Sequence, residues 1–432
     1  MTSTALLTDR YELTMLQAAL ADGTADRASV FELFSRRLTA GRRYGVVAGI
    51  GRALDALERF RFLDDELDWL RSADVVDTPT LDWLADYRFS GSMWGYAEGD
   101  VYLPQSPVVV VESTFAEGVL LETLLLSILN HDSAIASAAA RMISAAAGRP
   151  CIEMGSRRTH EWSAVAAARA AVIAGFAASS NLEAGRTYGV PTTGTSAHAF
   201  TLLHDTERDA FTAQIDSLGV GTTLLVDTYD VRTAIETAVE VAGPRLGAVR
   251  LDSGDLVSLA REVRTQLDDL GNPDTRIIVT SDLDEHAIAA LAAAPVDGYG
   301  VGTSLVTGSG VPTSGFVYKL VSRADDSGAM VPVAKASTSK TSVGGRKHAL
   351  RRRTNGIAVA EVVGIGEPPE DDGDDRSLLV ELVVDGRRVH APDLDEIQAH
   401  HRLALSELPA AAFQLSPGAP VIETVLEQQV AS

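Results

Sequence analysis

The chain has 432 residues, of which 46% are hydrophobic and 22% are charged, and its formal net charge is −22. This length exceeds that of one ordinary hydrophobic core, so we expect two packed domains. The acidic balance argues against nonspecific binding to nucleic acid or to an anionic membrane surface. It also means that an anionic ligand needs a local basic pocket.

Two further features of the composition bear on location. The single cysteine, Cys151, excludes an intramolecular disulfide framework and fits a reducing compartment. The opening residues lack the basic start and long apolar run of a secretory signal, and the apolar stretch 163–180 is interrupted by Arg169. We therefore expect a cytoplasmic protein that does not cross a membrane.

The N-terminal part of the chain predicts a mixture of helices and strands. Residues 5–23 predict a helix with leucines on one face, Thr8 or Asp9 as its cap, and Gly23 at its end. The further predicted elements are a strand at 28–34, a loop and helix within 44–62, a strand at 107–112, and a helix at 122–146 with a break near 130–132.

The central part contains four runs of apolar, β-branched residues that end in polar side chains. They are 222–229 (TTLLVDTY), 248–255 (AVRLDSGD), 276–282 (RIIVTSD) and 299–304 (YGVGTS). A strand–helix unit that repeats about every 25 residues predicts parallel strands joined by crossover helices. In such folds, ligands bind at the carboxyl ends of the strands.

The pattern changes after Gly315 to short alternating strands and one helix. The strands are predicted at 316–321, 331–335, 378–384 and 387–389, with Asp385-Gly386 as a hairpin turn, and the helix near 394–405. The simplest division is a strand–helix core at 116–315 between α+β segments at 1–115 and 316–432. We expect the two flanking segments to form one discontinuous domain.

The predicted ends of the four central strands carry acids, one arginine and glycines. These residues are Asp227, Arg250, Asp252, Ser281, Asp282, Gly300, Gly302 and Thr303. Strand alternation places Arg250 and Asp252 on one face, where arginine can hold a carboxylate and aspartate can hold a metal or a sugar hydroxyl. The backbone of a glycine turn can hold a phosphate. A helix cap is the alternative role of Asp252, although Asp255 can serve as that cap.

Two other segments contain candidate ligand-binding side chains. In 153–158 (EMGSRR), Arg157 and Arg158 lie where a strand is predicted to lead into a helix, which favours an anion; a solvated basic pair is the alternative. In 194–200 (GTSAHAF), His198 lies among hydroxyl side chains, including that of Thr195, that suit a phosphoryl group or a carboxylate. A structural histidine is the alternative there.

A basic loop is predicted at 335–347 (KASTSKTSVGGRK). It brings Lys335, Lys340, Arg346 and Lys347 together with five hydroxyl side chains in a chain that is otherwise acidic. The composition is typical of a loop that binds a polyphosphate. An ordinary solvated loop explains the same composition.

Taken together, these segments resemble the nicotinate phosphoribosyltransferase family, and the likeness runs nearly end to end. It rests on LLTDRYELTM at 6–15, EMGSRR, GTSAHAF, LLVDTYD, VRLDSGDL, VTSDLDE, YGVGTSLVTG and KASTSKTSVGGRK. The resemblance implies an irregular, incomplete α/β barrel beside a discontinuous α+β domain. It also implies a homodimer in which the N-terminal DRY segment of one subunit reaches the active site of the other.

The reaction implied by the resemblance joins nicotinate to 5-phosphoribosyl 1-diphosphate and gives nicotinate mononucleotide and diphosphate, in NAD salvage. ATP hydrolysis drives it through a phosphohistidine. Mg²⁺ accompanies ATP and the diphosphate, which is expected to hold most of the metal.

The resemblance also implies roles for individual residues. His198 matches the phosphorylated histidine, and Asp252 matches an acid beside the ribosyl and pyridine groups, where Asp227 is a second candidate. The implied substrate-binding residues are Tyr11, Met154, Arg157, Thr195, Arg250 and Thr303, to which the strand ends and the basic loop add Ser281, Asp282, Gly302, Lys335 and Lys340. Met154 stands where many relatives have an aromatic residue, and its sulfur can pack on a ring.

Three alternatives remain at this point. A nicotinamide phosphoribosyltransferase shares the fold and takes the neutral amide. An aldolase of the α/β-barrel type needs a Schiff-base lysine at a strand end, and none of the four central strands supplies one, although Lys319 lies in a later strand. A non-catalytic nucleotide sensor is disfavoured because His198, Arg250 and Asp252 are all present.

Overall fold

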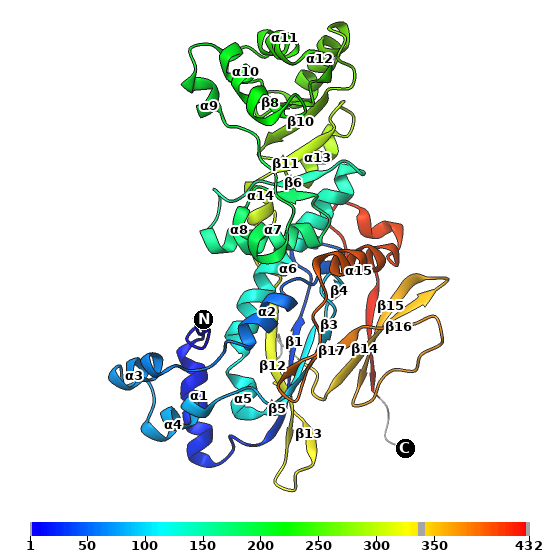
Figure 1. The fold of residues 1–432 in the computed structure, drawn as a ribbon. Coiled ribbons are helices and arrows are strands. Elements are labelled where there is room, and N and C mark those ends of the chain that lie inside the picture. Colours follow the sequence, from blue (N-terminus) through cyan, green and yellow to red (C-terminus); the bar gives the residue numbers. More distant parts are fainter. Residues whose placement is uncertain (1, 336–341, 429–432) are drawn as a thin grey trace. The chain divides into compact units, whose positions relative to one another are not determined.

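The computed structural model describes residues 2–335 and 342–428. The chain forms two compact units: unit 1 consists of Met1–Ala134 and Thr313–Ser432, and unit 2 of Ile135–Pro312. Segments from both ends of the chain therefore make up unit 1 (Figure 1). The sequence predicts the first boundary after residue 115, whereas in the structure it falls within the helix α6 (Glu122–Ala146).

Unit 2 is built around a six-stranded sheet in which all pairings are parallel. In spatial order the strands are β7 (Ala178–Ser179), β6 (Cys151–Glu153), β11 (Gly298–Val301), β10 (Arg276–Ser281), β9 (Ala248–Leu251) and β8 (Thr223–Leu225). The four runs singled out in the sequence form β8 to β11, so the prediction of parallel strands is confirmed. Their carboxyl ends meet at one edge of the sheet.

Helices alternate with these strands along the chain. They are α7 (Glu161–Ile173), α8 (Leu182–Tyr188), α9 (His198–Leu203), α10 (Glu207–Leu218), α11 (Val231–Ala242), α12 (Leu256–Asp269), α13 (Glu285–Leu291) and α14 (Thr303–Val306). α11 and α12 each bury one apolar stripe, as expected of amphipathic crossover helices. α7 is buried on all sides over 164–173, which explains its run of alanines.

Unit 1 contains a seven-stranded antiparallel sheet that draws on both ends of the chain. In order, its strands are β13 (Met330–Pro332), β12 (Phe316–Ala324), β1 (Ala28–Ser35), β5 (Val109–Thr114), β3 (Ser92–Tyr96), β17 (Leu379–Val384) and β18 (Arg387–Arg388). β17 and β18 form the predicted hairpin, and both turn residues, Asp385 and Gly386, have positive φ.

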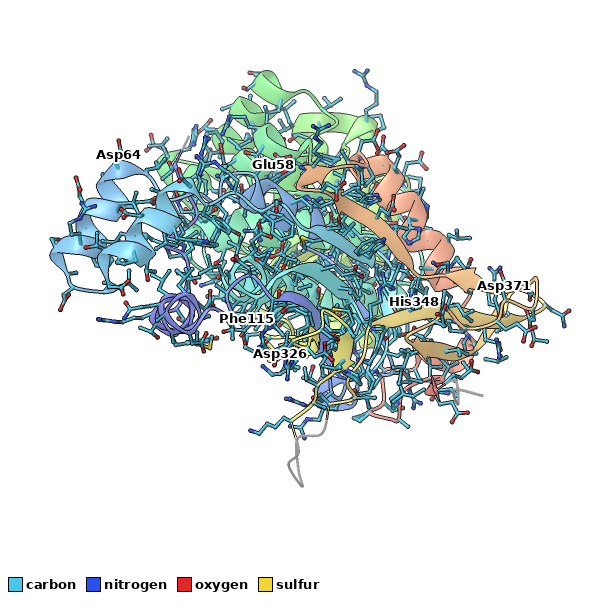
Figure 2. The ribbon with its side chains drawn as sticks, turned by 90° about the horizontal axis from the view of Figure 1, so that it is seen from below. Glu58, Asp64, Phe115, Asp326, His348 and Asp371 are labelled. Carbon is cyan, nitrogen blue, oxygen red and sulfur yellow. The ribbon has the colours of Figure 1, made fainter. Side chains whose placement is uncertain are left out.

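The remaining elements of unit 1 are two smaller sheets and six short helices. One sheet contains β16 (Arg376–Ser377), β14 (Lys347–Thr354), β15 (Ile357–Ile365) and β19 (Glu423–Gln428), and the other β2 (Gly45–Val46) and β4 (Val101–Tyr102). The helices are α1 (Arg10–Asp22), α2 (Ile50–Leu57), α3 (Asp64–Ser72), α4 (Thr78–Asp86), α5 (Phe115–Val119) and α15 (Leu394–Ser406). Asp371 lies on the loop between β15 and β16 (Figure 2).

The predicted break in α6 near 130–132 is wrong. The helix continues because its polar side chains find tertiary partners and do not compete for its backbone. Asn130 Oδ1 accepts a hydrogen bond from the backbone of Phe316 at 2.8 Å, and Asp132 pairs with Arg52 at 2.7 Å. The stretch Phe115–Ala146 is long and apolar enough to span a membrane, but 61% of its most apolar window is buried, as in the core helix of a globular protein.

Candidate active site

The register of the parallel sheet aligns polar residues that lie far apart in the chain. Leu225 of β8, Arg250 of β9 and Ile278 of β10 are neighbours across the three strands. Asp227 follows β8 closely, and Asp252 follows β9 directly. Arg250, Asp227 and Asp252 therefore gather at the carboxyl edge of the sheet, where ligands bind in folds of this type.

A hydrogen-bonded link joins the two aspartates. Asp227 Oδ2 accepts from the backbone N–H of Asp252 and from the Ser253 hydroxyl, both at 2.9 Å. The other oxygen, Asp227 Oδ1, is buried and has no hydrogen-bond partner among the described residues. A buried carboxylate oxygen without a partner is costly, so it is suited to a ligand or a cation.

Arg250 lies beside both aspartates and is half-buried. Its Nη1 is 3.4 Å from Thr195 Oγ1, and its Nε is buried without a partner among the described residues. Burial lowers the pKa of Arg250, the neighbouring Asp252 and Asp227 oppose this shift, and Arg157 adds to it. Four of the predicted site residues thus share one electrostatic environment, and one guanidinium nitrogen remains unpaired in it.

His198 is joined to the same edge through Thr228. His198 is the first residue of α9, and the Nδ1 atom of its imidazole lies 3.1 Å from Thr228 Oγ1. Thr228 directly follows Asp227 in the chain. The histidine thus lies next to the segment that carries Asp227, at the sheet edge where Arg250 and Asp252 also lie.

Asp252 is not a helix cap. It accepts a short hydrogen bond from Thr280 Oγ1 of β10, whereas Asp255 caps α12 by accepting from the backbone of Ser258. Asp230 caps α11 in the same way and is therefore structural. The other predicted residues at the end of β10, Ser281 and Asp282, are exposed.

Met154 lies over Gly300 at the sheet edge. Its backbone N–H donates to Val301 at 2.8 Å, and a Cβ atom added to Gly300 would lie 2.7 Å from the Met154 sulfur. Gly300 is part of β11, so the predicted turn from Gly300 to Gly302 is wrong: only Gly302 lies beyond the strand, as the residue before α14. The glycine makes room for the thioether.

Arg157 lies between the end of β6 and the start of α7, as the sequence predicts. α7 begins at Glu161 with His160 as its N-cap, so Arg157 lies in the loop before the helix and not at its N-terminus. The side chain is exposed. Its electrostatic effect on Arg250 nevertheless shows that it lies near the strand ends, where its charge can reach an anion.

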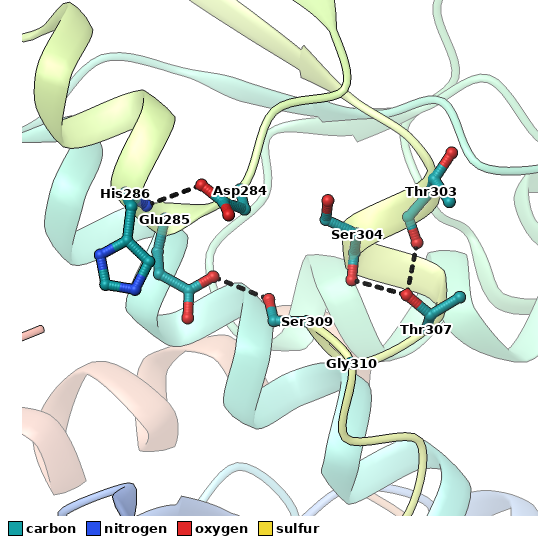
Figure 3. A pocket seen from close by; sticks show the side chains of 8 residues that line it. All are labelled: Asp284, Glu285, His286, Thr303, Ser304, Thr307, Ser309 and Gly310. Atoms are coloured by element: carbon teal, nitrogen blue, oxygen red, sulfur yellow. Dashed lines mark hydrogen bonds between the residues drawn. The ribbon is translucent and has the colours of Figure 1, made fainter. Parts of the chain in front are cut away.

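A polar pocket of about 210 Å³ lies beside Thr303 (Figure 3). Its lining residues are Asp284, Glu285, His286, Thr303, Ser304, Thr307, Ser309 and Gly310. Glu285 is held by Arg141 at 2.9 Å and by Ser309 at 2.7 Å, while Asp284 caps α13. Because both acids are already bonded, the lining presents chiefly hydroxyl groups around Thr303.

Three predicted substrate-binding residues, Tyr11, Lys335 and Lys340, fall in unit 1. Tyr11 lies in the first turn of α1, two positions after the N-cap Asp9, and is 44% exposed. Partial burial and then the carboxylates of Glu122, Glu12 and Asp9 raise the pKa of Tyr11 to about 12, so the phenol stays protonated at neutral pH. Lys335 is exposed, and Lys340 lies outside the described residues.

The basic loop 335–347 contributes fewer free charges than its sequence predicts. Lys347 is buried and its Nζ lies 2.5 Å from Glu32. Arg346 pairs with Glu112 at 2.9 Å and lies over the ring of Trp94. These two cations anchor the end of the loop to the seven-stranded sheet and are not available to a ligand.

Sequence reasoning missed several side chains of this region. Thr228 and Thr280 lie inside two of the quoted segments, where attention to hydroxyls next to the acids would have found them. The pocket residues Glu285 and Thr307 lie inside quoted segments as well, whereas Ser309 lies outside them; nothing local shows that α13 and the turn after α14 bring the three together.

The fold and the edge group define a class of protein. Unit 2 is a parallel α/β domain with an arginine, two carboxylates, an imidazole and a hydroxyl-lined pocket at or near its strand ends. Such a set of side chains is suited to a small substrate that carries both anionic and hydroxyl groups.

Comparison with known proteins shows which family within this class the chain resembles. Residues 6–130 match the model of the nicotinate phosphoribosyltransferase N-terminal domain. The chain is 58% identical to nicotinate phosphoribosyltransferase pncB1 of Mycobacterium tuberculosis over 429 residues, covering 97% of this chain and 94% of the relative. It is 38% identical to the nicotinate phosphoribosyltransferase of Bacillus subtilis over 360 residues, covering 81% and 73%.

The fold comparison agrees with the sequence comparison. The crystal structure of human nicotinic acid phosphoribosyltransferase matches with a TM-score of 0.83 at 25% identity, covering 97% of both chains. The chain therefore belongs to the nicotinate phosphoribosyltransferase family, as its sequence motifs predict. It is an enzyme with a mixed α/β fold, in which the parallel sheet of unit 2 forms a curled half-barrel.

Proposed function

We propose that this chain catalyses the ATP-coupled transfer of a 5-phosphoribosyl group from its 1-diphosphate to nicotinate. The products are nicotinate mononucleotide and diphosphate, and the reaction belongs to NAD salvage. The single observation that carries the proposal is the grouping of His198, Asp227, Arg250 and Asp252 at one sheet edge, in a chain of this family.

Arg250 holds the carboxylate of nicotinate in this proposal. Its unpaired, buried Nε offers a donor that the folded chain leaves unused, and a planar guanidinium matches a carboxylate. Met154 packs on the pyridine ring through its sulfur. Arg157 adds positive charge nearby, which an anionic substrate needs in a chain with a net charge of −22.

The ribosyl group reacts between the base and the two aspartates. The lone pair of the pyridine nitrogen forms the new bond to the anomeric carbon, and the electron pair of the breaking C–O bond leaves with diphosphate. Asp227 and Asp252 stabilise the positive charge that develops on the sugar. The pocket at Thr303, the exposed Ser281 and Asp282, and the half-buried Gly302 bind the phosphate and hydroxyl groups.

His198 couples the reaction to ATP. Its imidazole takes the γ-phosphoryl group, and the bond to ADP breaks with its electron pair on ADP. The basic side chains of Lys335 and Lys340 are the candidates to neutralise the added negative charge. Hydrolysis of the phosphohistidine by water then releases phosphate and regenerates the imidazole.

The edge group fits Mg²⁺ as well. Asp227 Oδ1 is buried and without a protein partner in the described part of the chain, and carboxylate oxygens are the ligands that Mg²⁺ prefers. Asp227 and Asp252 would share the metal with diphosphate or ATP, which supply most of its ligands. When bound, Mg²⁺ neutralises negative charge on the diphosphate.

The finer architecture belongs to the same proposal. Unit 2 corresponds to an irregular, incomplete barrel, and the two segments of unit 1 to one discontinuous α+β domain. A homodimer with shared active sites explains why Tyr11 keeps an exposed ring at the start of α1. The expected compartment is the cytoplasm, which fits the single cysteine of the chain.

One assay tests the proposal. The full chain is incubated with 5-phosphoribosyl 1-diphosphate, Mg²⁺ and either nicotinate or nicotinamide, with and without ATP, and the mononucleotide is measured by chromatography. We expect nicotinate mononucleotide, more of it with ATP, and little product from the amide. Equal or faster use of nicotinamide would instead identify the amide as the substrate, and no product from either base would contradict the proposed activity.

A further inference from the structure

A second pocket, of about 230 Å³, lies in unit 1 among β1, β12 and the start of α5. It is lined by Thr24, Arg27, Ser29, Phe115, Leu320 and Arg323. Figure 2 labels Phe115, which forms one wall, and Asp326, whose carboxylate contacts Arg27. The six lining residues play no part in the proposed reaction.

A β-bulge shapes this pocket. Ser29 of β1 pairs with Arg323 of β12 and Phe31 pairs with Leu320, so β12 has one extra residue between the two pairs. In a regular strand, residues three apart point to opposite faces. The extra residue restores Leu320 and Arg323 to one face, the face of Ser29, as bulges commonly re-aim side chains.

The charge of the pocket is unusual for this chain. Two arginines line it, although acidic side chains outnumber basic ones by 59 to 37. Arg323 donates to the backbone oxygen of Ala324 at 3.0 Å and has no carboxylate within salt-bridge distance among the described residues. Arg27 pairs at 2.7 Å with Asp326, whose side chain is 92% exposed, so solvent screens that pair.

Two further carboxylates act on the pocket arginines, Asp325 on Arg323 and Asp22 on Arg27. Asp325, which accepts from Ser327, and Asp22, which accepts from Thr24, are both open to water, so solvent screens their charge. The two guanidinium groups retain most of their hydrogen-bond donors for a ligand, because each has five N–H groups.

The pocket also has an apolar side. The rings of Phe115 and Phe31 lie 6.1 Å apart, so Phe115 is fixed at the pocket wall by packing. Leu320 packs against the same core and remains only partly buried. Two cations next to a ring and a leucine suit a compound that joins a doubly charged anion to a small apolar group.

We propose that this pocket binds a small phosphate monoester whose organic part is a single ring or a short apolar chain. Arg323 and Arg27 hold the phosphate, and Phe115 and Leu320 contact the organic part. The site is independent of the catalytic edge group in unit 2, so it does not depend on the proposed function. Two guanidinium groups favour a dianionic phosphate over a monoanionic carboxylate.

Phenyl phosphate is the probe for this site, measured by isothermal titration calorimetry on the full-length Arg250→Ala variant, which removes the arginine of the catalytic edge group. Inorganic phosphate tests the contribution of the ring, and benzoate tests the preference for phosphate. We expect phenyl phosphate to bind more tightly than either. Arg323→Met should weaken it about tenfold, the loss of one charge-assisted contact.

Matched variants keep the test decisive. Arg27→Met should also weaken phenyl phosphate and serves where Arg323→Met fails to fold, while Arg71→Met, at an exposed arginine of α3, should leave binding unchanged. No binding of phenyl phosphate, or unchanged binding in both pocket variants, would overturn the proposal. Tighter binding of benzoate than of phenyl phosphate would overturn the assignment to phosphate esters.

Discussion

Nδ1 of His198 lies 3.1 Å from the hydroxyl oxygen of Thr228, which directly follows Asp227 in the chain. The contact gives one ring nitrogen a partner and leaves Nε2 without one among the described residues. When Nδ1 carries the proton, it donates to Thr228, and the lone pair of Nε2 is the nucleophile. Thr228 is thus a positioning residue for the proposed phosphoryl acceptor.

Replacement of Thr228 by valine should slow phosphorylation of His198 about fivefold, because a neutral hydrogen bond contributes roughly 1 kcal/mol. Transfer of label from γ-³²P-ATP to the protein, followed over time, measures this. Thr228→Ser keeps the hydroxyl and should label at nearly the rate of the original chain. Equal rates for the valine and serine variants would show that the hydroxyl does not orient the ring.

His198→Asn should abolish the acid-labile phosphoenzyme and the coupling to ATP while leaving weak, ATP-independent synthesis of the mononucleotide. Asparagine keeps a polar side chain at the start of α9 but has no nucleophilic ring nitrogen. The measurement is the ratio of ADP to mononucleotide formed. If that ratio persists in the variant, the phosphoryl acceptor is another residue.

Motif-based prediction succeeded where the chemistry and the strand boundaries coincide. The runs VDTY, RLDSGD and VTSD each begin inside or next to a buried strand, so parallel pairing alone brings Asp227, Arg250 and Asp252 to one edge. Prediction failed where the role of a side chain depends on residues that are distant in the sequence. Nothing local indicates that Lys347 is buried against Glu32 or that Asn130 is held by Phe316.

Arg250→Ala should raise the apparent KM for nicotinate far more than that for ATP, because in the proposed complex the guanidinium contacts the pyridine carboxylate. It should also narrow the preference for nicotinate over nicotinamide, since the amide does not use that charge. Steady-state kinetics with each base measures both effects. Thr195→Ala removes the 3.4 Å contact to Arg250 and the implied hydroxyl contact to the substrate, and should raise KM less because the guanidinium charge remains. Equal increases for nicotinate and ATP would argue against the carboxylate contact.

Gly300→Ala tests the position of Met154. The added Cβ would lie 2.7 Å from the Met154 sulfur and 2.5 Å from a methyl carbon of Thr280, so at least one of these side chains has to move. We expect a higher KM for nicotinate, with a loss of stability of about 1–3 kcal/mol from overpacking. Gly221→Ala meets nothing within 4 Å and should change neither quantity. An unchanged KM for the Gly300 variant would mean that Met154 does not contact the base.

The limits of sequence reading are clearest in the region around Glu12. The motif LLTDRYELTM was identified from its letters, yet the sequence gives no sign that Glu12 bonds to Thr123 at the start of α6. The glutamate is buried on one face of α1 and accepts from the Thr123 backbone at 2.9 Å. A carboxylate of one helix thus caps a helix that begins more than a hundred positions later in the chain.

The free-energy cost of burying the ionised Glu12 carboxylate depends on pH. Burial raises the pKa of Glu12 from 4.5 to about 6, although its hydrogen bonds with Thr123 and Thr8 oppose the shift. Because the folded state holds the proton more tightly, the contribution of Glu12 to stability falls as pH rises from below 4.5 to above 6. A shift of this size corresponds to about 2 kcal/mol.

Glu12→Gln removes this titration and keeps an oxygen that accepts from Thr123. Other titrating groups are common to both proteins, so the difference in unfolding free energy isolates Glu12. We expect the variant to gain about 2 kcal/mol relative to the original chain between pH 4 and pH 7, as measured by urea denaturation at each pH. If the variant instead loses stability relative to the original chain as pH rises, the hydrogen bonds to the carboxylate outweigh its burial. A difference in unfolding free energy that does not depend on pH would mean that Glu12 has the same pKa in the folded and unfolded chain.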